Sequence, residues 1–283
     1  MQREFSADDG LRIFFDVYPV DRPRAAVQIA HGVGEHAGRY RGLAEHLVAE
    51  GYLVYADDHR GHGRTGMEQW HGDASKLGRL GPGGLRAALR DLRAFTRLIR
   101  DENPDLPLVI LGHSWGSFLA QILVNAHPEA YDGIILSGSA LRVPGALNAG
   151  DLNAKWKATD ATGLAWLSSD LRVADEFVAD PLTVATPLLR LFGPIDAARL
   201  FGRPRKDLGR DIPLLLIVGR DDPVGGPRSV HRLAEAYRTR SGFTDVTTLV
   251  YPDARHELFN EVAQAEVRAD VIAWLDARFP TRG

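Results

Sequence analysis

The chain has 283 residues and no cysteine, and its 34 Lys and Arg side chains nearly balance 37 Asp and Glu, leaving a formal net charge of -3. This length suits one large domain or a domain with an insertion. The near-neutral charge argues against a nucleic-acid partner, because phosphate recognition usually needs a concentrated basic face. The lack of cysteine excludes disulfides, thiolate metal sites and thiol nucleophiles.

Two stretches bear on export and membrane insertion. Residues 1–10 (MQREFSADDG) carry four charged side chains where a secretory signal needs an apolar run. Residues 106–127 lack Asp, Glu, Lys and Arg, but a proline and a Gly-His-Ser turn interrupt them, a pattern typical of strand, turn and helix. We therefore expect a cytoplasmic protein with no integral membrane segment.

Short apolar runs alternate with helical patterns along most of the chain. In residues 85–99, leucines and other apolar side chains fall on one stripe and arginines on the opposite one, which predicts an amphipathic helix. Such alternation is the pattern of a parallel sheet covered on both faces. The expected strands are residues 11–18, 25–30, 53–56, 108–111, 133–136, 214–218 and 246–250. The expected helices include residues 40–50, 85–99, 118–126 and 263–279.

The alternation stops between residues 140 and 210. This stretch holds helical patterns at 162–168, 173–179 and 188–201 but no strand-like run. It predicts a helical cap, residues 140–210, inserted into an α/β core formed by residues 1–139 and 211–283. Leucine, tryptophan and phenylalanine are frequent in the cap. We expect most of them to pack within it and the surplus to line an apolar tunnel.

A G-x-S-x-G pentapeptide, GHSWG at residues 112–116, directly follows one expected strand and precedes an expected helix. Its glycines suit a turn too sharp for side chains, which leaves Ser114 exposed in strained geometry. This context indicates a nucleophilic serine.

A serine nucleophile needs a base, and the base needs an acid that orients it, in the chain order Ser, Asp, His. Asp222 follows the strand at 214–218, and His256 follows the strand at 246–250. Asp222 is our choice for the acid, with Asp221 as the alternative, because adjacent side chains on a turn cannot both face the histidine.

Such chemistry also requires backbone donors for the oxyanion. One is expected from the residue after the nucleophile, Trp115. The other is expected from the glycine-rich loop after the strand at 25–30, where Val33 is the candidate.

Five blocks together resemble the α/β-hydrolase superfamily, and within it the monoacylglycerol lipase and lysophospholipase-like (serine aminopeptidase-like) group. They are HGVGEHAGRY (31–40), DHRGHGRT (58–65), ILGHSWGS (110–117), IVGRDDPVG (217–225) and ARHELFNE (254–261). The resemblance implies an eight-stranded, mostly parallel sheet with flanking helices. It also implies a triad of Ser114, Asp222 and His256 with an oxyanion hole at Val33 and Trp115.

The first block contains Glu35 and Arg39, and the sequence allows two roles for this pair. In glyceride-hydrolysing relatives this Glu and Arg face the glycerol moiety, which would put both residues at the polar end of a substrate site; the alternative is a salt bridge within the loop. The sequence around the G-x-S-x-G pentapeptide departs from the group at two positions. Trp115 stands where a smaller or flexible residue is more usual, and Ser117 stands where a glycine is more usual.

These features predict a serine hydrolase of lipid-type carboxylic esters, above all a monoacylglycerol lipase, with a small lipid-like ester as substrate. The alternatives are a lysophospholipase, or a peptidase or amidase whose acidic pocket would come from Asp170, Asp175, Glu176 or Asp180. A non-catalytic ligand-binding relative is disfavoured by the intact triad. No metal-ligand or nucleotide motif is present, so we expect no metal and no cofactor. The cap could touch lipid surfaces transiently.

Overall fold

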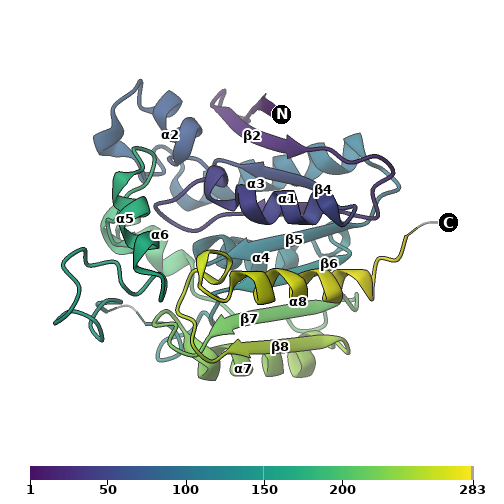
Figure 1. The fold of residues 1–283 in the computed structure, drawn as a ribbon. Helices are drawn as coiled ribbons and strands as arrows, with labels where there is room; N and C mark the ends of the chain where they lie inside the picture. The colour runs from purple at the N-terminus through teal and green to yellow at the C-terminus, as the bar shows by residue number, and fades with distance from the viewer. Residues whose placement is uncertain (149, 282–283) are drawn as a thin grey trace.

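The computed structural model describes residues 1–148 and 150–281, and a single eight-stranded sheet forms its centre (Figure 1). The strands are β1 (Gln2–Ser6), β2 (Arg12–Tyr18), β3 (Ala26–Ala30), β4 (Leu53–Asp57), β5 (Leu108–His113), β6 (Gly133–Ser137), β7 (Leu214–Gly219) and β8 (Val246–Tyr251). They lie in the order β1-β2-β4-β3-β5-β6-β7-β8, and only the β1–β2 and β2–β4 pairs are antiparallel. The predicted eight-stranded, mostly parallel sheet is confirmed.

Seven strands lie where the apolar runs predict them, to within two residues at either end. The eighth, β1, has no counterpart among the runs read from the residues. Four of its five side chains are exposed, and it pairs only with β2 at the edge of the sheet. A strand that buries so little carries no apolar pattern in its sequence.

Helices cover both faces of the sheet. One core cluster packs α3, α4 and α7 against one face, and a second packs α1 and α8 against the other, where Figure 1 shows α1 and α8 side by side. β5, at the centre, contributes alternate residues to the two clusters, which explains its unbroken apolar run. These helices are α1 (Arg41–Ala49), α3 (Gly84–Glu102), α4 (Trp115–Ala126), α7 (Gly226–Ala236) and α8 (Gln264–Asp276).

Shorter helical pieces complete these layers. A seven-residue helix, α2 (Gly63–Gln69), follows β4. Single 3₁₀ turns lie at Ala37–Tyr40, Ala74–Lys76, Pro128–Ala130 and Leu258–Asn260, and a π turn at Tyr237–Ser241. None of the described helices combines the length and the apolarity that crossing a bilayer requires.

Between β6 and β7 the chain leaves the sheet and forms α5 (Leu171–Ala179) and α6 (Leu188–Arg199). The helix predicted at 162–168 is wrong, since that segment is a series of turns. Asp160 accepts hydrogen bonds from the backbone N–H groups of Thr162 and Ala165, and Gly163 has a φ of +75°. A side-chain acceptor that captures backbone donors offers the chain an alternative to helical bonding.

The last predicted helix of this segment, 188–201, is confirmed with a break. α6 contains Gly193 with φ 74° and ψ 170°, outside the helical region, followed by Pro194. Proline lacks the N–H that would continue the helical ladder, and only glycine adopts this φ readily. α6 is therefore two short helical pieces joined at a kink.

Candidate active site

Ser114 lies in the turn between β5 and α4, with φ 51° and ψ -122°. The two glycines of the pentapeptide are required by close backbone approach. A Cβ on Gly112 would lie 2.6 Å from the carbonyl oxygen of Gly116, and a Cβ on Gly116 would overlap the carbonyl oxygen of Ala30. The Ser114 N–H donates to the carbonyl of Ser137 at 2.9 Å, which ties the turn to β6.

The structure brings Asp222 and His256 together at the carboxyl ends of β7 and β8. The Nδ1 atom of His256 lies 3.0 Å from Oδ1 of Asp222, and both side chains are almost fully buried. Asp221 points elsewhere, because its carboxylate pairs with Lys155 at 2.7 Å and remains partly exposed. Of the two candidate aspartates, Asp222 is therefore the one that orients the histidine.

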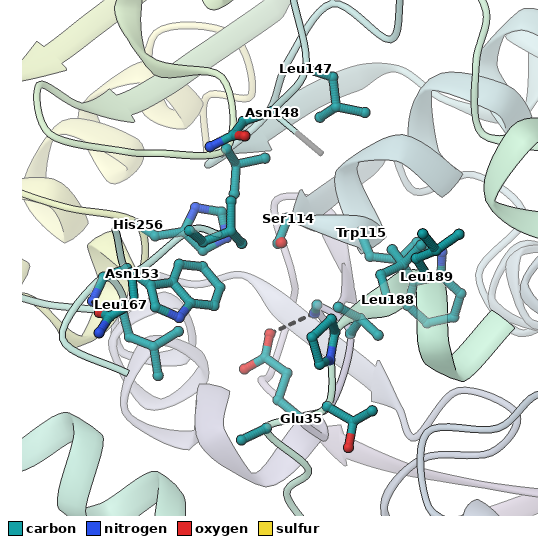
Figure 2. A pocket seen from close by; sticks show the side chains of 18 of the residues that line it. Glu35, Ser114, Trp115, Leu147, Asn148, Asn153, Leu167, Leu188, Leu189 and His256 are labelled. Atoms are coloured by element: carbon teal, nitrogen blue, oxygen red, sulfur yellow. Dashed lines mark hydrogen bonds between the residues drawn. The ribbon is translucent and has the colours of Figure 1, made fainter. Parts of the chain in front are cut away.

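The surroundings of His256 favour an imidazole that can accept a proton. Burial lowers the pKa of His256, but the charge and hydrogen bond of Asp222, together with the charges of Glu257 and Glu35, outweigh burial and raise this pKa above its ordinary value of 6.5. With Nδ1–H donating to Asp222, the Nε2 atom is free, and it has no hydrogen-bond partner among the described residues. Figure 2 shows Ser114 and His256 on the wall of the same cavity.

The glycine-rich loop after β3 runs directly against the serine. A Cβ on Gly32 would lie 3.1 Å from Cβ of Ser114. Val33 and Trp115 both line the cavity at this point. The two residues predicted to supply oxyanion donors thus flank the serine on the cavity wall.

Glu35 and Arg39 form part of a buried polar cluster. Oε1 of Glu35 accepts the Gly32 N–H at 2.5 Å and the Tyr40 hydroxyl at 2.7 Å, and Oε2 accepts Nε of Arg39 at 3.2 Å. Nη2 of Arg39 also donates to Glu257 at 2.5 Å. Burial, with the nearby Glu257 charge, raises the pKa of Glu35. Glu35 lines the cavity and Arg39 does not, so the geometry favours the salt bridge within the loop.

The cavity beside Ser114 has a volume of about 470 Å³, and its walls are mostly apolar (Figure 2). Side chains from the loops of the sheet and from the segment between β6 and β7 contribute to it. Three of the described acidic residues line it: Glu35, Asp151 and Glu257. The four acidic residues considered for an amine pocket, Asp170, Asp175, Glu176 and Asp180, are not among the described residues that line it.

Backbone hydrogen bonds attach the segment between β6 and β7 to the loops that carry these residues. The carbonyl of Leu167 accepts the N–H groups of His256 at 3.1 Å and Glu257 at 2.7 Å. The N–H of Val184 donates to the carbonyl of Gly34 at 2.7 Å. These contacts leave no sequence signal, because a backbone group reveals nothing of its partner.

Two side chains at the site were missed by sequence reasoning. Glu257 follows the predicted base and His31 opens the glycine-rich loop, and both are buried. The sequence offered one signal for them: each has an ionisable side chain and lies within a motif of the site. Among the described residues, no three His, Asp or Glu side chains are grouped so that they could hold a metal ion.

Comparison with known proteins finds a matching family and related lipases. Residues 21–263 match the family described as serine aminopeptidase, S33. The chain is 34% identical to the monoacylglycerol lipase of Mycolicibacterium smegmatis, over 97% of this chain and 96% of that protein. It is 28% identical to the monoglyceride lipase of Mus musculus, over 97% of this chain and 90% of the mouse protein.

Solved structures agree in fold. A thermostable carboxyl esterase from Bacillus coagulans, in complex with glycerol, superposes with a TM-score of 0.81 at 25% identity, covering 99% of this chain and 98% of that one. A soluble variant of monoglyceride lipase from Saccharomyces cerevisiae gives a TM-score of 0.76, covering 100% and 96% of the two chains, and at 22% identity this likeness shows the fold alone. The chain therefore belongs to the serine aminopeptidase S33 family of α/β-hydrolases.

Proposed function

We propose that this protein hydrolyses lipid-type carboxylic esters, foremost monoacylglycerols, through an acyl-enzyme formed on Ser114. The observation that carries the proposal is the buried hydrogen bond between Asp222 and Nδ1 of His256, which leaves Nε2 of His256 without a partner among the described residues. His256 lines the same cavity as Ser114, whose backbone is strained. The names of the relatives, monoacylglycerol lipase and monoglyceride lipase, support the same substrate class.

The mechanism follows from this arrangement. Ser114 Oγ attacks the ester carbonyl while Nε2 of His256 takes the hydroxyl proton, and Asp222 holds the imidazolium. The N–H groups of Val33 and Trp115 stabilise the oxyanion. The alcohol leaves with the proton from His256, and a water molecule, deprotonated by His256, then releases the fatty acid and restores Ser114.

The substrate site has an apolar part and a polar part. We assign the apolar walls contributed by residues 140–210 to the acyl chain, and so divide the chain into a core, residues 1–139 and 211–283, and a cap, residues 140–210. The polar part lies at Glu35, with Arg39 behind it and bonded to its carboxylate outside the cavity. Glu35 and Arg39 already form hydrogen bonds within the protein, so neither needs a substrate hydroxyl as a partner.

Exposed apolar side chains of the cap, two of which (Leu189 and Phe201) also line the cavity, support a transient contact with lipid aggregates. Most of the large apolar side chains that are exposed in the described structure belong to this segment: Leu171, Val178, Leu189, Ile195 and Phe201. They lie on α5, on α6 and just after α6, and exposed apolar groups that form a patch are a feature of interaction surfaces. An enzyme whose substrate resides in such aggregates gains from this contact.

Ser114→Ala tests the proposal. The rates of the wild type and of Ser114→Ala are measured on a panel of substrates. The panel contains p-nitrophenyl esters from acetate to palmitate, 1-oleoylglycerol, lysophosphatidylcholine and leucine p-nitroanilide. We expect 1-oleoylglycerol to be preferred over the phospholipid and the anilide, and Ser114→Ala to lose about 10⁴-fold or more of kcat while circular dichroism stays native. Retained activity in a folded Ser114→Ala protein, or anilide turnover exceeding ester turnover, would overturn it.

A further inference from the structure

The backbone of Gly32 is held on both of its polar groups by buried side chains. Its N–H donates to Oε1 of Glu35 at 2.5 Å, and its carbonyl oxygen lies 2.7 Å from Nδ1 of His31. His31 is fully buried and Glu35 is 3% exposed. The two buried side chains therefore clamp this one glycine from both sides.

The contacts of His31 fix its tautomer. A carbonyl oxygen can only accept, so Nδ1 must carry the proton that bonds to Gly32. The Nε2 atom lies 3.0 Å from the backbone N–H of His59, which can only donate, so Nε2 must be unprotonated. Burial, and then the neighbouring His59 and His62, lower the pKa of His31 well below 6.5, in agreement with a neutral ring. The ring also stacks on His59 at 4.0 Å, which prevents its rotation.

The clamp determines where the next N–H points. In a trans peptide the C=O and the following N–H point in opposite directions. Because the Gly32 carbonyl is turned toward His31, the N–H of Val33 is turned away from His31. The side of Gly32 that a Cβ would occupy faces Ser114, and Val33 lines the cavity.

We infer that His31 and Glu35 are positioning residues that hold the Gly32–Val33 peptide so that the Val33 N–H meets the oxyanion; this rests on the proposed function of Ser114. An oxyanion donor accelerates the reaction only when it is fixed before charge develops. Glu35 then acts on the transition state through the backbone. It does not need to touch the alcohol part of the substrate, and its oxygens are already occupied by Gly32, Tyr40 and Arg39.

Two substrates that share an acyl group separate this role from binding of the glycerol moiety. p-Nitrophenyl butyrate has no glycerol, whereas 1-butyrylglycerol does. We expect Glu35→Ala to lower kcat by about 10- to 100-fold on both esters, with KM changed less than about threefold, because a small displacement of a catalytic group costs up to about 10²-fold. A raised KM on 1-butyrylglycerol alone, with normal turnover of p-nitrophenyl butyrate, would overturn the inference and assign Glu35 to the substrate.

His31 is tested by a pair of substitutions. The amide of His31→Asn can still donate to the Gly32 carbonyl, whereas His31→Ala cannot. We expect the asparagine variant to recover at least about tenfold of the kcat that the alanine variant loses. Equal kcat in the two folded variants would contradict the clamp.

A transition-state analogue gives a readout that a merely structural role would not move. Butylboronic acid forms a tetrahedral adduct on a serine, so its inhibition constant should weaken in proportion to the loss of kcat/KM across the Glu35 and His31 variants. Asp276→Asn is the matched control, because Asp276 also holds a tyrosine hydroxyl (Tyr52, 2.7 Å) and an arginine (Arg24, 2.6 Å) but does not line the cavity. This control variant should leave both the inhibition constant of butylboronic acid and kcat/KM unchanged.

The outcomes keep the two proposals apart. An active Ser114→Ala protein defeats the proposed function. An inactive Ser114→Ala protein with wild-type kcat in Glu35→Ala defeats only the positioning role. Should Glu35→Ala fail to fold, Glu35→Met carries the test, because the methionine side chain fills a similar volume but offers the Gly32 N–H no comparable acceptor. It should lower kcat on both esters, and wild-type kcat on both would defeat the inference.

Discussion

Ser114 and His256 are both held in states that a solvated residue would not adopt. A non-glycine residue with φ 51° costs of the order of 1–3 kcal/mol, which the bonding of the turn to β6 has to offset. His256 is 1% exposed, yet its pKa is raised because Asp222 lies beside it. The proposed chemistry thus depends on local strain and on one buried hydrogen bond between His256 and Asp222.

Activity is expected to fall as the pH is lowered through a pKa above 6.5. The neutral imidazole is the base, and a folded pKa above the ordinary value means that protonation abolishes catalysis at a higher pH than for a solvated histidine. Asp222→Asn removes the charge that raises this pKa, so the acid limb should move to lower pH while kcat falls by about 10⁴-fold. The measurement is kcat/KM for p-nitrophenyl butyrate against pH.

Asp221→Asn is the control for this experiment. Its carboxylate pairs with Lys155 and not with His256, so the variant should keep the wild-type pH profile. A profile that shifts in Asp221→Asn and not in Asp222→Asn would reverse the assignment of the acid.

At the scale of elements, the turn that carries Ser114 and the segment between β6 and β7 meet at Trp115. Its indole is fully buried, stacks on His62 at 5.2 Å and contacts Phe192 of α6 at 5.0 Å. It also lines the cavity, and Figure 2 shows it next to Leu188 and Leu189 of the same helix. The side chain that follows Ser114 therefore forms part of the cavity wall and packs against α6.

Trp115→Met is expected to lengthen the acyl chain that the cavity accepts. The smaller side chain keeps the backbone N–H but frees space toward α6, and each accommodated methylene is worth about 1–3 kcal/mol of discrimination. The ratio of kcat/KM for p-nitrophenyl palmitate to that for the butyrate should rise about tenfold.

Trp274→Met serves as the matched substitution, because Trp274 is buried in α8 and does not line the cavity. It should lower stability by a similar amount, about 2 kcal/mol, without changing the ratio. An unchanged ratio in Trp115→Met would show that this wall does not limit the acyl chain.

At the scale of the whole molecule, histidines buried without charge make the fold sensitive to acid. Burial lowers the pKa of His31, His62 and His113, and that of His62 falls to about 4. The unfolded chain, with ordinary histidine pKa values near 6.5, binds more protons than the folded one between these limits. The free energy of unfolding therefore falls as the pH drops from about 6.5 to about 4.

His62→Asn should reduce this acid sensitivity. The asparagine can still donate to the Arg60 carbonyl, as Nδ1 of His62 does at 3.0 Å, but it has no proton to gain. Urea unfolding at several pH values should give a shallower decline below pH 6.5 for the variant than for the wild type. Parallel declines would show that His62 does not contribute.

How far the sequence predicts the site depends on what kind of contact defines it. The order of strand ends was enough to select Ser114 and His256, because in a parallel sheet all these ends meet at one edge. It narrowed the acid to Asp221 or Asp222, and only the folded turn separates these neighbours. The fold was predicted wherever burial imposes a period, and not at β1, which buries little, nor at 162–168, where Asp160 captures the backbone.

The insertion point between β6 and β7 has a consequence for how the protein folds. Ile134 of β6 pairs with Leu214 of β7, and the whole segment 140–210 lies between them in the chain. Closing so long a loop costs entropy before any strand contact repays it, and such non-local pairing slows folding. We therefore expect β7 and β8 to join the sheet late and to bring Asp222 and His256 with them. Recovery of enzymatic activity during refolding should then lag behind the return of most of the secondary structure.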